Sequence, residues 1–486
     1  MNIIPPLQIN SPDYWCTWET QYGLARRTAE ADTAMNEAIS FAGDQGAIRA
    51  RASLDENALF GNPDLVHQFS EVRGSLFLIL DDGWDVDYSA NPKNNRKEFG
   101  SLCLNESRFP SCQGSPAERL KALNDKVKAC GWRGIGIWVC AQKSGAEYTA
   151  PFEANEKTYN YWKEKLLMSK EAQVRYWKVD WGRLAHCEEF RKMLTDMGHE
   201  LYPELIIEHA YCASPINGDI EHEKMRFSDQ PVCAEGSLRF AAFSDVFRSY
   251  DVTPALSVAT TLDRLQHLLT PQSGTINCED ELYIGAVLGC AVGVMRSRFT
   301  ENTKLDEITA AVRWHSVAPA FAGGEFFRSE EIKSDTFLFA PQDTWFSPVW
   351  EKSVSQSAPR IMARNAPLPK VENESSPYVL LSKNPNGVYS VGAIPVSSPT
   401  AKHEAPPTVS FEADEPPYIG IFGTFGRLTV TLSKKPVRAY IQSLIRGEAQ
   451  ELPIDGNEIT VSADLLTALH PSKDGSQSAV IIKLEY

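Results

Sequence analysis

Short apolar segments alternate with helical segments over the first two-thirds of this 486-residue chain. The run from Ser75 to Leu80 is the clearest of the apolar segments, and it ends at two adjacent carboxylates, Asp81 and Asp82. Apolar runs this short, bounded by turns, are typical of strands that are buried on both faces of a parallel sheet. Their regular alternation with helices predicts a (β/α)8 barrel, the TIM-barrel fold.

The expected elements of this barrel can be placed along the chain. The strands are expected at 14–20, 75–80, 134–140, 174–180, 204–209, 246–251, 275–278 and 292–297, and the helices at 29–41, 116–130, 155–170, 188–198 and 254–269.

The pattern changes after about residue 330. Helical periodicity is lost, Pro and Ser become frequent in segments such as 366–369 and 395–407, and short apolar strands are separated by turn pairs such as Asp455-Gly456. Short strands punctuated by Gly-containing turns indicate antiparallel β structure. We therefore expect two domains, a barrel over 1–330 and an antiparallel β-sandwich over 331–486 with Pro- and Ser-rich linker segments.

The charge balance argues against two classes of partner. The chain has 48 Lys and Arg against 63 Asp and Glu, which gives a net charge of −15. Nucleic acids and anionic membrane surfaces attract basic faces, so neither is expected as a partner. No apolar segment is long enough to span a bilayer, and the first residues lack the basic and apolar regions of a signal peptide. The expectation is a cytoplasmic protein or the mature form of an exported one, with its oligomeric state open.

The cysteines do not predict a metal site or a cofactor. Ten Cys are scattered through the chain, without a CxxC pair and without a His/Cys spacing that suits zinc. In a protein of this size we expect free and mostly buried thiols.

Polar side chains fall at the C-terminal ends of successive expected strands. In a (β/α)8 barrel those ends meet at one mouth, where active sites lie. Unrelated surface charges would not gather at the same end of each strand, so the pattern favours an enzyme. These residues are Glu19, Asp81, Asp82, Cys140, Lys178, Asp180, Glu208, Arg248 and Asp251.

Two carboxylates of this set suit glycosidic bond cleavage, which needs one ionised carboxylate and one protonated carboxyl group. Asp180 suits the first role because Lys178, two residues earlier, points to the same side of the strand and would keep Asp180 ionised. The structural alternative is a simple Lys–Asp pair. Asp251 suits the second role, although its spacing alone favours the structural alternative, in which it caps the helix expected from residue 254. Asp81 and Asp82 are either a site or a turn closed by Gly83.

The order of the motifs adds a resemblance to a known family. The motifs are Asp81-Asp82-Gly83-Trp84, Arg108-Phe109-Pro110, Gly134-Ile135-Gly136-Ile137-Trp138, Lys178-Val179-Asp180, Ile207-Glu208-His209 and Arg248-Ser249-Tyr250-Asp251. In this order they resemble the clan D α-galactosidases, glycoside hydrolase families 27 and 36. The last motif is one residue shorter than the family 27 acid/base segment, and His209 stands where that family usually has Trp.

The resemblance implies a role for each residue. Asp180 would be the nucleophile and Asp251 the acid/base of a retaining mechanism, with Asp229 and Asp245 as rivals for the second role. The implied substrate-binding residues are Asp81 and Asp82 at the 4- and 6-hydroxyls of galactose, Lys178 at the hydroxyls next to them, Glu208 and Arg248 near the 2-position, and Trp18, Trp84 and Trp138 as apolar walls.

The expected function is therefore that of a retaining exo-α-glycosidase acting on terminal galactose-type sugars, with carbohydrate as its partner. Two alternatives stay open. One is a related clan D specificity, α-N-acetylgalactosaminidase or β-L-arabinopyranosidase. The other belongs to a different class, a barrel that binds carbohydrate without catalysis, because a fold does not guarantee an activity.

Overall fold

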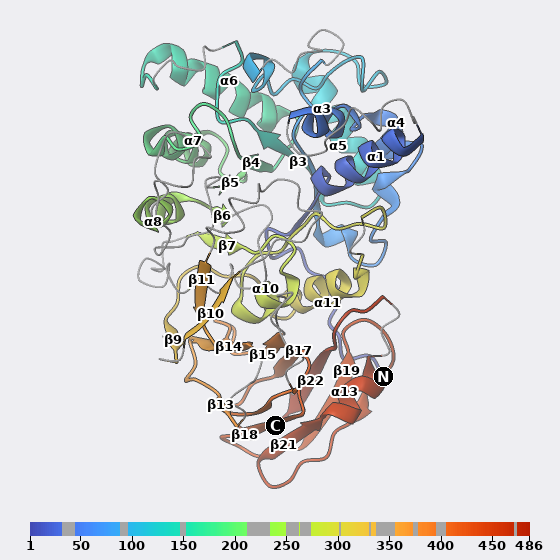
Figure 1. Ribbon diagram of the computed structural model, residues 1–486, viewed down its shortest axis with the longest axis vertical. Coiled ribbons are helices and arrows are strands. Elements are labelled where there is room, and N and C mark those ends of the chain that lie inside the picture. Colours follow the sequence, from blue (N-terminus) through green and yellow to red (C-terminus); the bar gives the residue numbers. More distant parts are fainter. Residues whose placement is uncertain are drawn as a thin grey trace.

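Eight parallel strands form the first part of the protein (Figure 1). The computed structural model describes residues 1–31, 44–87, 96–145, 152–210, 234–248, 262, 274–300, 303–329, 332–336, 355–372, 378–394, 405–470 and 474–486. The parallel strands are β1 (Tyr14–Cys16), β2 (Phe77–Leu80), β3 (Gly134–Val139), β4 (Tyr176–Val179), β5 (Ile206–Ala210), β6 (Val246–Arg248), β7 (Thr275–Asn277) and β8 (Gly293–Val294).

The strands run in the order β7-β6-β5-β4-β3-β2-β1-β8, each parallel to its neighbour. A further parallel bridge joins Asn277 at the end of β7 to Ala291 just before β8, which closes the sheet on itself. The prediction of a (β/α)8 barrel is confirmed.

Helices surround this barrel, and local chemistry shows clearly where one of them, α5 (Pro116–Ala129), begins and ends. The N-terminus of α5 is fixed by a capping box in which Ser115 and Glu118 satisfy each other's backbone N–H groups, with Pro116 as the first helical residue. Gly131, with φ of +93°, follows the end of α5 and turns the chain toward β3. The helices are α1 (Trp18–Ala31), α3 (Asp44–Ala52), α4 (Glu56–Phe60), α5 (Pro116–Ala129), α6 (Glu156–Glu171), α7 (Glu188–Leu201), α8 (Ala234–Phe243), α10 (Leu282–Leu288) and α11 (Leu305–His315).

The first strand and helix differ from the prediction. The strand expected over 14–20 ends at Cys16, and α1 already begins at Trp18. Trp18 and Tyr22, one helical turn apart, pack edge-to-face with ring centres 5.0 Å apart. This four-residue spacing is helical. The alternation of aromatic and small residues in the same segment had suggested a strand instead. Glu19 therefore lies in the first turn of a helix and not at a strand end. Most of the helix expected over 29–41 and of that expected over 254–269 falls outside the described residues.

The C-terminal part is a two-layered β structure, as predicted. Strands β9 (Phe326–Arg328), β12 (Ile361–Arg364), β14 (Tyr378–Lys383), β15 (Tyr389–Ile394), β17 (Tyr418–Gly423), β19 (Arg438–Ser443), β20 (Gln450–Glu451) and β22 (Ala479–Glu485) form the larger sheet. The smaller sheet contains β13 (Lys370–Val371), β16 (Thr408–Ala413), β18 (Arg427–Leu432) and β21 (Glu458–Ser462), while β10 (Ile332–Thr336) pairs with β11 (Ser355–Pro359) and α13 spans Ala463–Leu469.

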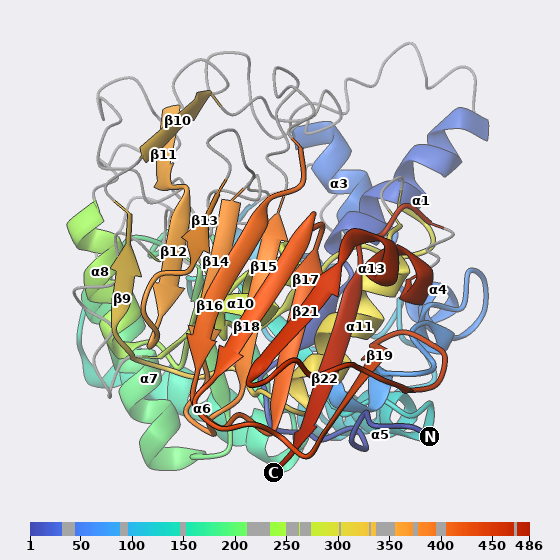
Figure 2. The same cartoon turned by 90° about the horizontal axis from the view of Figure 1, so that it is seen from below.

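The two sheets enclose a hydrophobic core of their own (Figure 2). Their pairing is mixed, since β12–β14, β15–β17 and β16–β18 are parallel while the other pairs are antiparallel. The domain boundary near residue 330 stays a prediction.

Helices α10 and α11 lie between the barrel and the larger sheet (Figure 1). Glycines allow the close approach: a Cβ on Gly392 would lie 2.8 Å from the side chain of Val287, and one on Gly420 would lie 2.8 Å from Trp314. Arg364, buried on β12, donates to the backbone oxygen of Leu288 at the end of α10 at 2.6 Å. The β domain is therefore packed against the barrel and hydrogen bonded to it.

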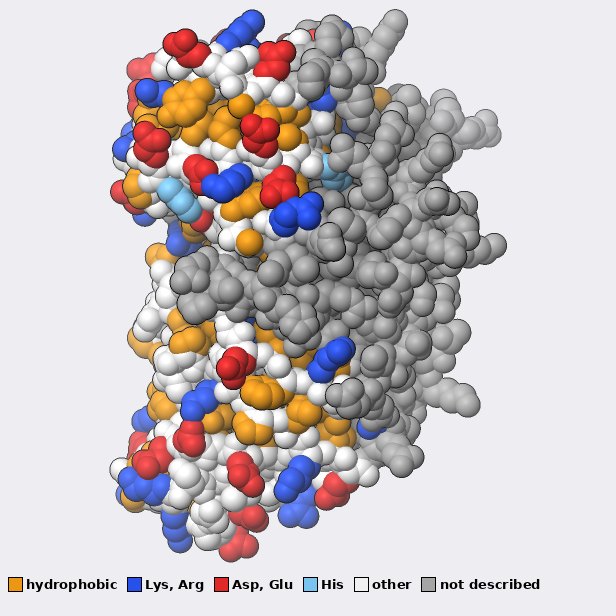
Figure 3. Space-filling model, turned by 90° about the vertical axis from the view of Figure 1, so that its left-hand side faces the viewer, with side chains coloured by type: hydrophobic (Ala, Val, Ile, Leu, Met, Phe, Trp, Pro, Cys, Tyr) orange, Lys and Arg blue, Asp and Glu red, His pale blue; other side chains and the backbone are white. Residues whose placement is uncertain are grey.

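The face in Figure 3 shows acidic and basic side chains interspersed with apolar ones on the described residues. Within those residues, none of the helices is both long enough and apolar enough to cross a membrane.

Candidate active site

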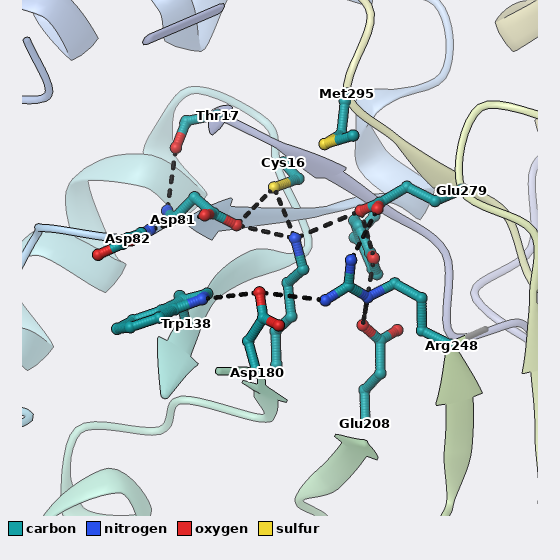
Figure 4. Close-up of polar contacts among 12 residues, drawn as sticks. Cys16, Thr17, Asp81, Asp82, Trp138, Asp180, Glu208, Arg248, Glu279 and Met295 are labelled. Carbon is teal, nitrogen blue, oxygen red and sulfur yellow. Dashed lines mark hydrogen bonds and ion pairs between the residues drawn. The ribbon is translucent and has the colours of Figure 1, made fainter. Parts of the chain in front are cut away.

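Polar side chains from most of the barrel strands meet inside the C-terminal end of the barrel (Figure 4). We call six of them the inner cluster: Asp81, Lys178, Asp180, Glu208, Arg248 and Glu279. All six are at most 3% exposed. Charged groups buried to this degree are stable only when they are paired, so the contacts among them define the site.

Lys178 is one of the two cations of the inner cluster. Alternation along β4 places Lys178 inside the barrel and turns Trp177 outward against α6, where its indole donates to Ser169. The Nζ atom of Lys178 lies 2.8 Å from Asp81 Oδ2 and 3.3 Å from Glu279 Oε1. Burial and the charge of Arg248 lower the pKa of Lys178, but these carboxylates outweigh them and raise it above the usual value. The ammonium group therefore stays charged.

Arg248 is the second cation and contacts three carboxylates. Its Nη1 lies 2.9 Å from Glu279, its Nε lies 3.1 Å from Glu208 and its Nη2 lies 3.3 Å from Asp180. Burial lowers the pKa of Arg248, but the charges of Glu279 and Asp180 raise it well above its usual value. One side chain at the end of β6 thus joins the ends of β4, β5 and β7.

Asp180 follows β4 and is held from two sides at one oxygen. Its Oδ2 accepts a hydrogen bond from the indole of Trp138 at 3.1 Å and lies 3.3 Å from Arg248. The sequence predicted Lys178 as the cation that keeps Asp180 ionised. The structure places Arg248 against Asp180 instead, because Lys178 is taken up by Asp81 and Glu279.

Glu208 is surrounded by donors that the sequence did not reveal. It accepts hydrogen bonds from Tyr176 at 2.8 Å and Asn277 at 2.7 Å, and Tyr14 lies within 3.2 Å of its other oxygen. Burial raises the pKa of Glu208, and the charge of Arg248 opposes that shift. Both tyrosines are also fully buried. In the sequence, these tyrosines resembled ordinary core residues of a strand.

Glu279 is the functional candidate that sequence reasoning missed. It follows the short strand β7 and contacts both cations, and Tyr14 donates to it at 2.9 Å. The only sequence signal was a carboxylate directly after a short strand, in the run Cys278-Glu279-Asp280-Glu281.

Asp81 and Asp82 have different partners although they are neighbours. Asp81 belongs to the inner cluster and also accepts from the Cys16 thiol at 2.8 Å. Asp82 extends away from Lys178 (Figure 4). Its Oδ2 accepts from Arg51 Nε at 2.8 Å and from the Trp181 indole at 3.0 Å. Burial raises the pKa of Asp82 to about 7, against the opposing charge of Arg51.

The predicted aromatic walls occupy three different environments. Trp138 contacts Asp180 directly, and its ring centre lies 5.2 Å from that of Trp181. Trp84 is fully buried in the hydrophobic core and donates its indole N–H to the backbone oxygen of Trp138. Trp18 packs on Tyr22 at the start of α1. Trp138 is therefore the best placed of the three to contact a ligand of Asp180.

The acid/base candidates are placed only in part. Asp251 and its rival Asp229 lie outside the described residues. The other rival, Asp245, precedes β6 and so lies at the opposite end of the barrel from Arg248. It accepts from the backbone N–H of Ile207 at 2.9 Å and pairs with His199 at 2.7 Å.

The inner cluster contains four carboxyl groups and two cations. Its closely spaced donors and acceptors suit the hydroxyl groups of a polyol. Among the described residues, no group of three or more His, Cys, Asp and Glu is arranged to hold a metal ion.

Comparison with known proteins gives matches in structure only. No protein-family model matches the sequence, and no curated protein matches it. Solved structures of glycosidases do align with the chain over almost its whole length.

A family 27 β-L-arabinopyranosidase from Geobacillus stearothermophilus, in complex with arabinose, aligns at 10% identity and a TM-score of 0.44, covering 98% of this chain and 97% of that one. An α-galactosidase from Saccharomyces cerevisiae with raffinose aligns at 9% identity and a TM-score of 0.46, covering 98% of each chain. A putative α-N-acetylgalactosaminidase from Bacillus halodurans aligns at 11% identity and a TM-score of 0.41, covering 100% and 99%.

Proposed function

We propose that this protein is a retaining exo-α-glycosidase that hydrolyses terminal galactose-type sugars through a covalent glycosyl–Asp180 intermediate. The observation that supports it best is the setting of Asp180, a buried carboxylate at a barrel strand end with Arg248 and the Trp138 indole against the same oxygen. A nearby cation and a hydrogen-bond donor both favour the ionised form, which is the form that attacks an anomeric carbon.

In this mechanism Asp180 forms a bond to the anomeric carbon while the bond to the leaving oxygen breaks. The acid/base, which we assign to Asp251 from the resemblance, gives its proton to that oxygen. Water then attacks the anomeric carbon, loses its proton to the same residue and releases Asp180. Two displacements at one carbon restore its original configuration.

The other members of the inner cluster would bind the sugar. Asp81 and Lys178 offer an acceptor and a donor side by side, and Glu208 and Arg248 offer the same combination on the other side of Asp180. Vicinal hydroxyl groups act as donors and acceptors at once, so they match such pairs. The site would therefore bind a sugar by several hydroxyl groups while Trp138 contacts its apolar face.

The test is an activity screen with 4-nitrophenyl α-galactoside, α-N-acetylgalactosaminide and β-L-arabinopyranoside. We expect nitrophenol release from at least one of them, and a loss of at least about 10³-fold in kcat for Asp180→Asn. Asp196→Asn is the matched control, because Asp196 pairs with Lys192 on the exposed face of α7. Full activity in Asp180→Asn would contradict the mechanism. Calorimetric binding of a sugar without turnover of any glycoside would favour a non-catalytic barrel.

A further inference from the structure

Arg51 lies against the site but comes from a segment that no motif singled out. It belongs to α3, between β1 and β2, and its side chain is 9% exposed. Its guanidinium group lies over the rings of Phe99 and Trp181, at 5.0 and 5.2 Å from their centres. Because it packs on two aromatic rings and pairs with Asp82, Arg51 has little rotational freedom.

The backbone around Arg51 is also fixed to the end of β2. Arg108 donates to the backbone oxygens of Arg51 and of Gly83, which follows Asp82. Gln21 donates to the backbone oxygens of Ala50 and Asp82, both at 3.1 Å. The positions of Arg51 and Asp82 are therefore fixed relative to each other by contacts other than their own ion pair.

The two protein donors to Asp82 gather at one of its oxygens. Arg51 and Trp181 both donate to Oδ2. The other oxygen, Oδ1, is buried and has no hydrogen-bond partner among the described residues. A buried acceptor without a donor is unfavourable and uncommon in folded proteins. The arrangement is explained if a ligand supplies that donor.

We propose that Arg51 is a positioning residue of this site: it holds Oδ2 of Asp82, a sugar-binding residue implied by the resemblance, so that Oδ1 is oriented to accept a hydrogen bond from one hydroxyl group of a neutral sugar. This inference rests on the proposed function. A sugar lacking that hydroxyl would leave Oδ1 buried and unpaired. A sugar with a carboxylate in place of the hydroxyl would set one hydrogen-bond acceptor against another, because Oδ1 is itself an acceptor. Both are disfavoured substrates.

The charge of Arg51 matters as well as its geometry. The titratable groups around Asp82 are Arg51 on α3, Tyr22 on α1, Asp81 beside it and Cys140 after β3. Burial raises the pKa of Tyr22 and of Cys140, so both stay neutral near pH 7. Arg51 is thus the cation that favours ionised Asp82. Without it, the pKa of Asp82 rises further and the ionised acceptor is lost at neutral pH.

The experiment measures a ratio, kcat/KM for the glycoside that the wild type hydrolyses fastest divided by kcat/KM for each of its 3-, 4- and 6-deoxy analogues. We expect a ratio of at least about ten for one analogue in the wild type. This ratio should fall toward one in Asp82→Ala and in Arg51→Gln. In Arg51→Gln the acid limb of kcat/KM should also move to higher pH. Arg51→Lys keeps the charge and should lie between wild type and Arg51→Gln.

The control is Arg49→Gln, which removes the same charge from the same helix and should leave both the ratio and the pH profile unchanged. A ratio and pH profile that stay at the wild-type values in Arg51→Gln, or in Arg51→Lys if the first variant does not fold, would overturn this inference alone. Absence of hydrolysis of every glycoside by the wild type would overturn it together with the proposed function.

Discussion

The inner cluster and the Arg51–Asp82 pair show two ways of burying carboxylates at one barrel mouth. In the inner cluster, Arg248 alone contacts three carboxylates, and Lys178 contacts two. In the pair, one cation meets one oxygen of Asp82 and the other oxygen is left without a donor among the described residues. A densely cross-linked cluster therefore fixes where its charges lie, whereas an incompletely paired carboxylate is suited to recognising a ligand.

Removal of the central cation of the inner cluster should have the largest effect. Arg248→Met would leave Asp180, Glu208 and Glu279 buried without their shared partner. We expect the free energy of unfolding to fall by about 3–5 kcal/mol, measured by urea denaturation.

The matched control for this change is Arg239→Met, because Arg239 pairs with Glu188 on the surface and should cost no more than about 1 kcal/mol. Equal losses in the two variants would contradict the view that Arg248 holds the inner cluster together.

Burial of ionised Asp82 should lower the free energy of unfolding. The pKa of Asp82 is about 7 in the folded protein against 3.8 for an ordinary Asp, so the folded state binds this proton more tightly. The contribution of Asp82 to stability is therefore lost as pH rises from about 4 to about 7. Asp82→Asn, which cannot ionise, should be more stable than wild type at pH 8, by up to about 4 kcal/mol.

The measurement is urea denaturation of wild type and Asp82→Asn at pH 5 and pH 8. The gain should be much smaller at pH 5, where Asp82 is protonated in the folded protein. A difference in stability that is the same at both pH values would show that Asp82 does not titrate as described.

The smallest expected effect concerns Glu279. Glu279→Gln keeps the shape of the side chain but removes a charge that both cations contact. We expect kcat/KM to fall about tenfold, because Lys178 and Arg248 lose one of the groups that position them. The charge of Glu279 also adds to the effect of burial in raising the pKa of Glu208, so the pH profile should shift to lower pH.

Glu281→Gln tests whether this effect is specific, since Glu281 lies two residues further on and interacts with a different set of charges, those of Arg296, Asp280, Glu307 and Lys304. If Glu279→Gln behaves like Glu281→Gln in both kcat/KM and pH profile, Glu279 has no positioning role.

The sequence predicted the barrel and the β-sandwich because both depend on the periodicity of apolar residues, which is a local signal. It also placed Asp81, Lys178, Asp180, Glu208 and Arg248 at strand ends, and the structure brings these five together. The partners of each charge could not be predicted in the same way. Arg248, and not Lys178, contacts Asp180, because the competition among several carboxylates is decided by side chains from different strands.

The residues that were missed share this dependence on distant contacts. Arg51 lies in a polar segment, and only the fold brings it 2.8 Å from Asp82. Tyr14 and Tyr176 have the residue type and spacing of core residues in a strand. Their role as hydrogen-bond donors is visible only once the fold places their hydroxyl groups beside Glu208. Glu279 follows a strand of three residues, too short to give a clear periodicity.

Trapping the glycosyl–enzyme intermediate would show whether Asp180 forms a covalent bond to the sugar. The protein would be incubated with 5-fluoro-α-galactosyl fluoride, digested and examined by mass spectrometry. We expect one added fluorogalactosyl group on the peptide that contains Asp180, and no label on that peptide in Asp180→Asn. A label on another carboxylate, or steady turnover of the α-galactoside with an inverted product and no label, would contradict it.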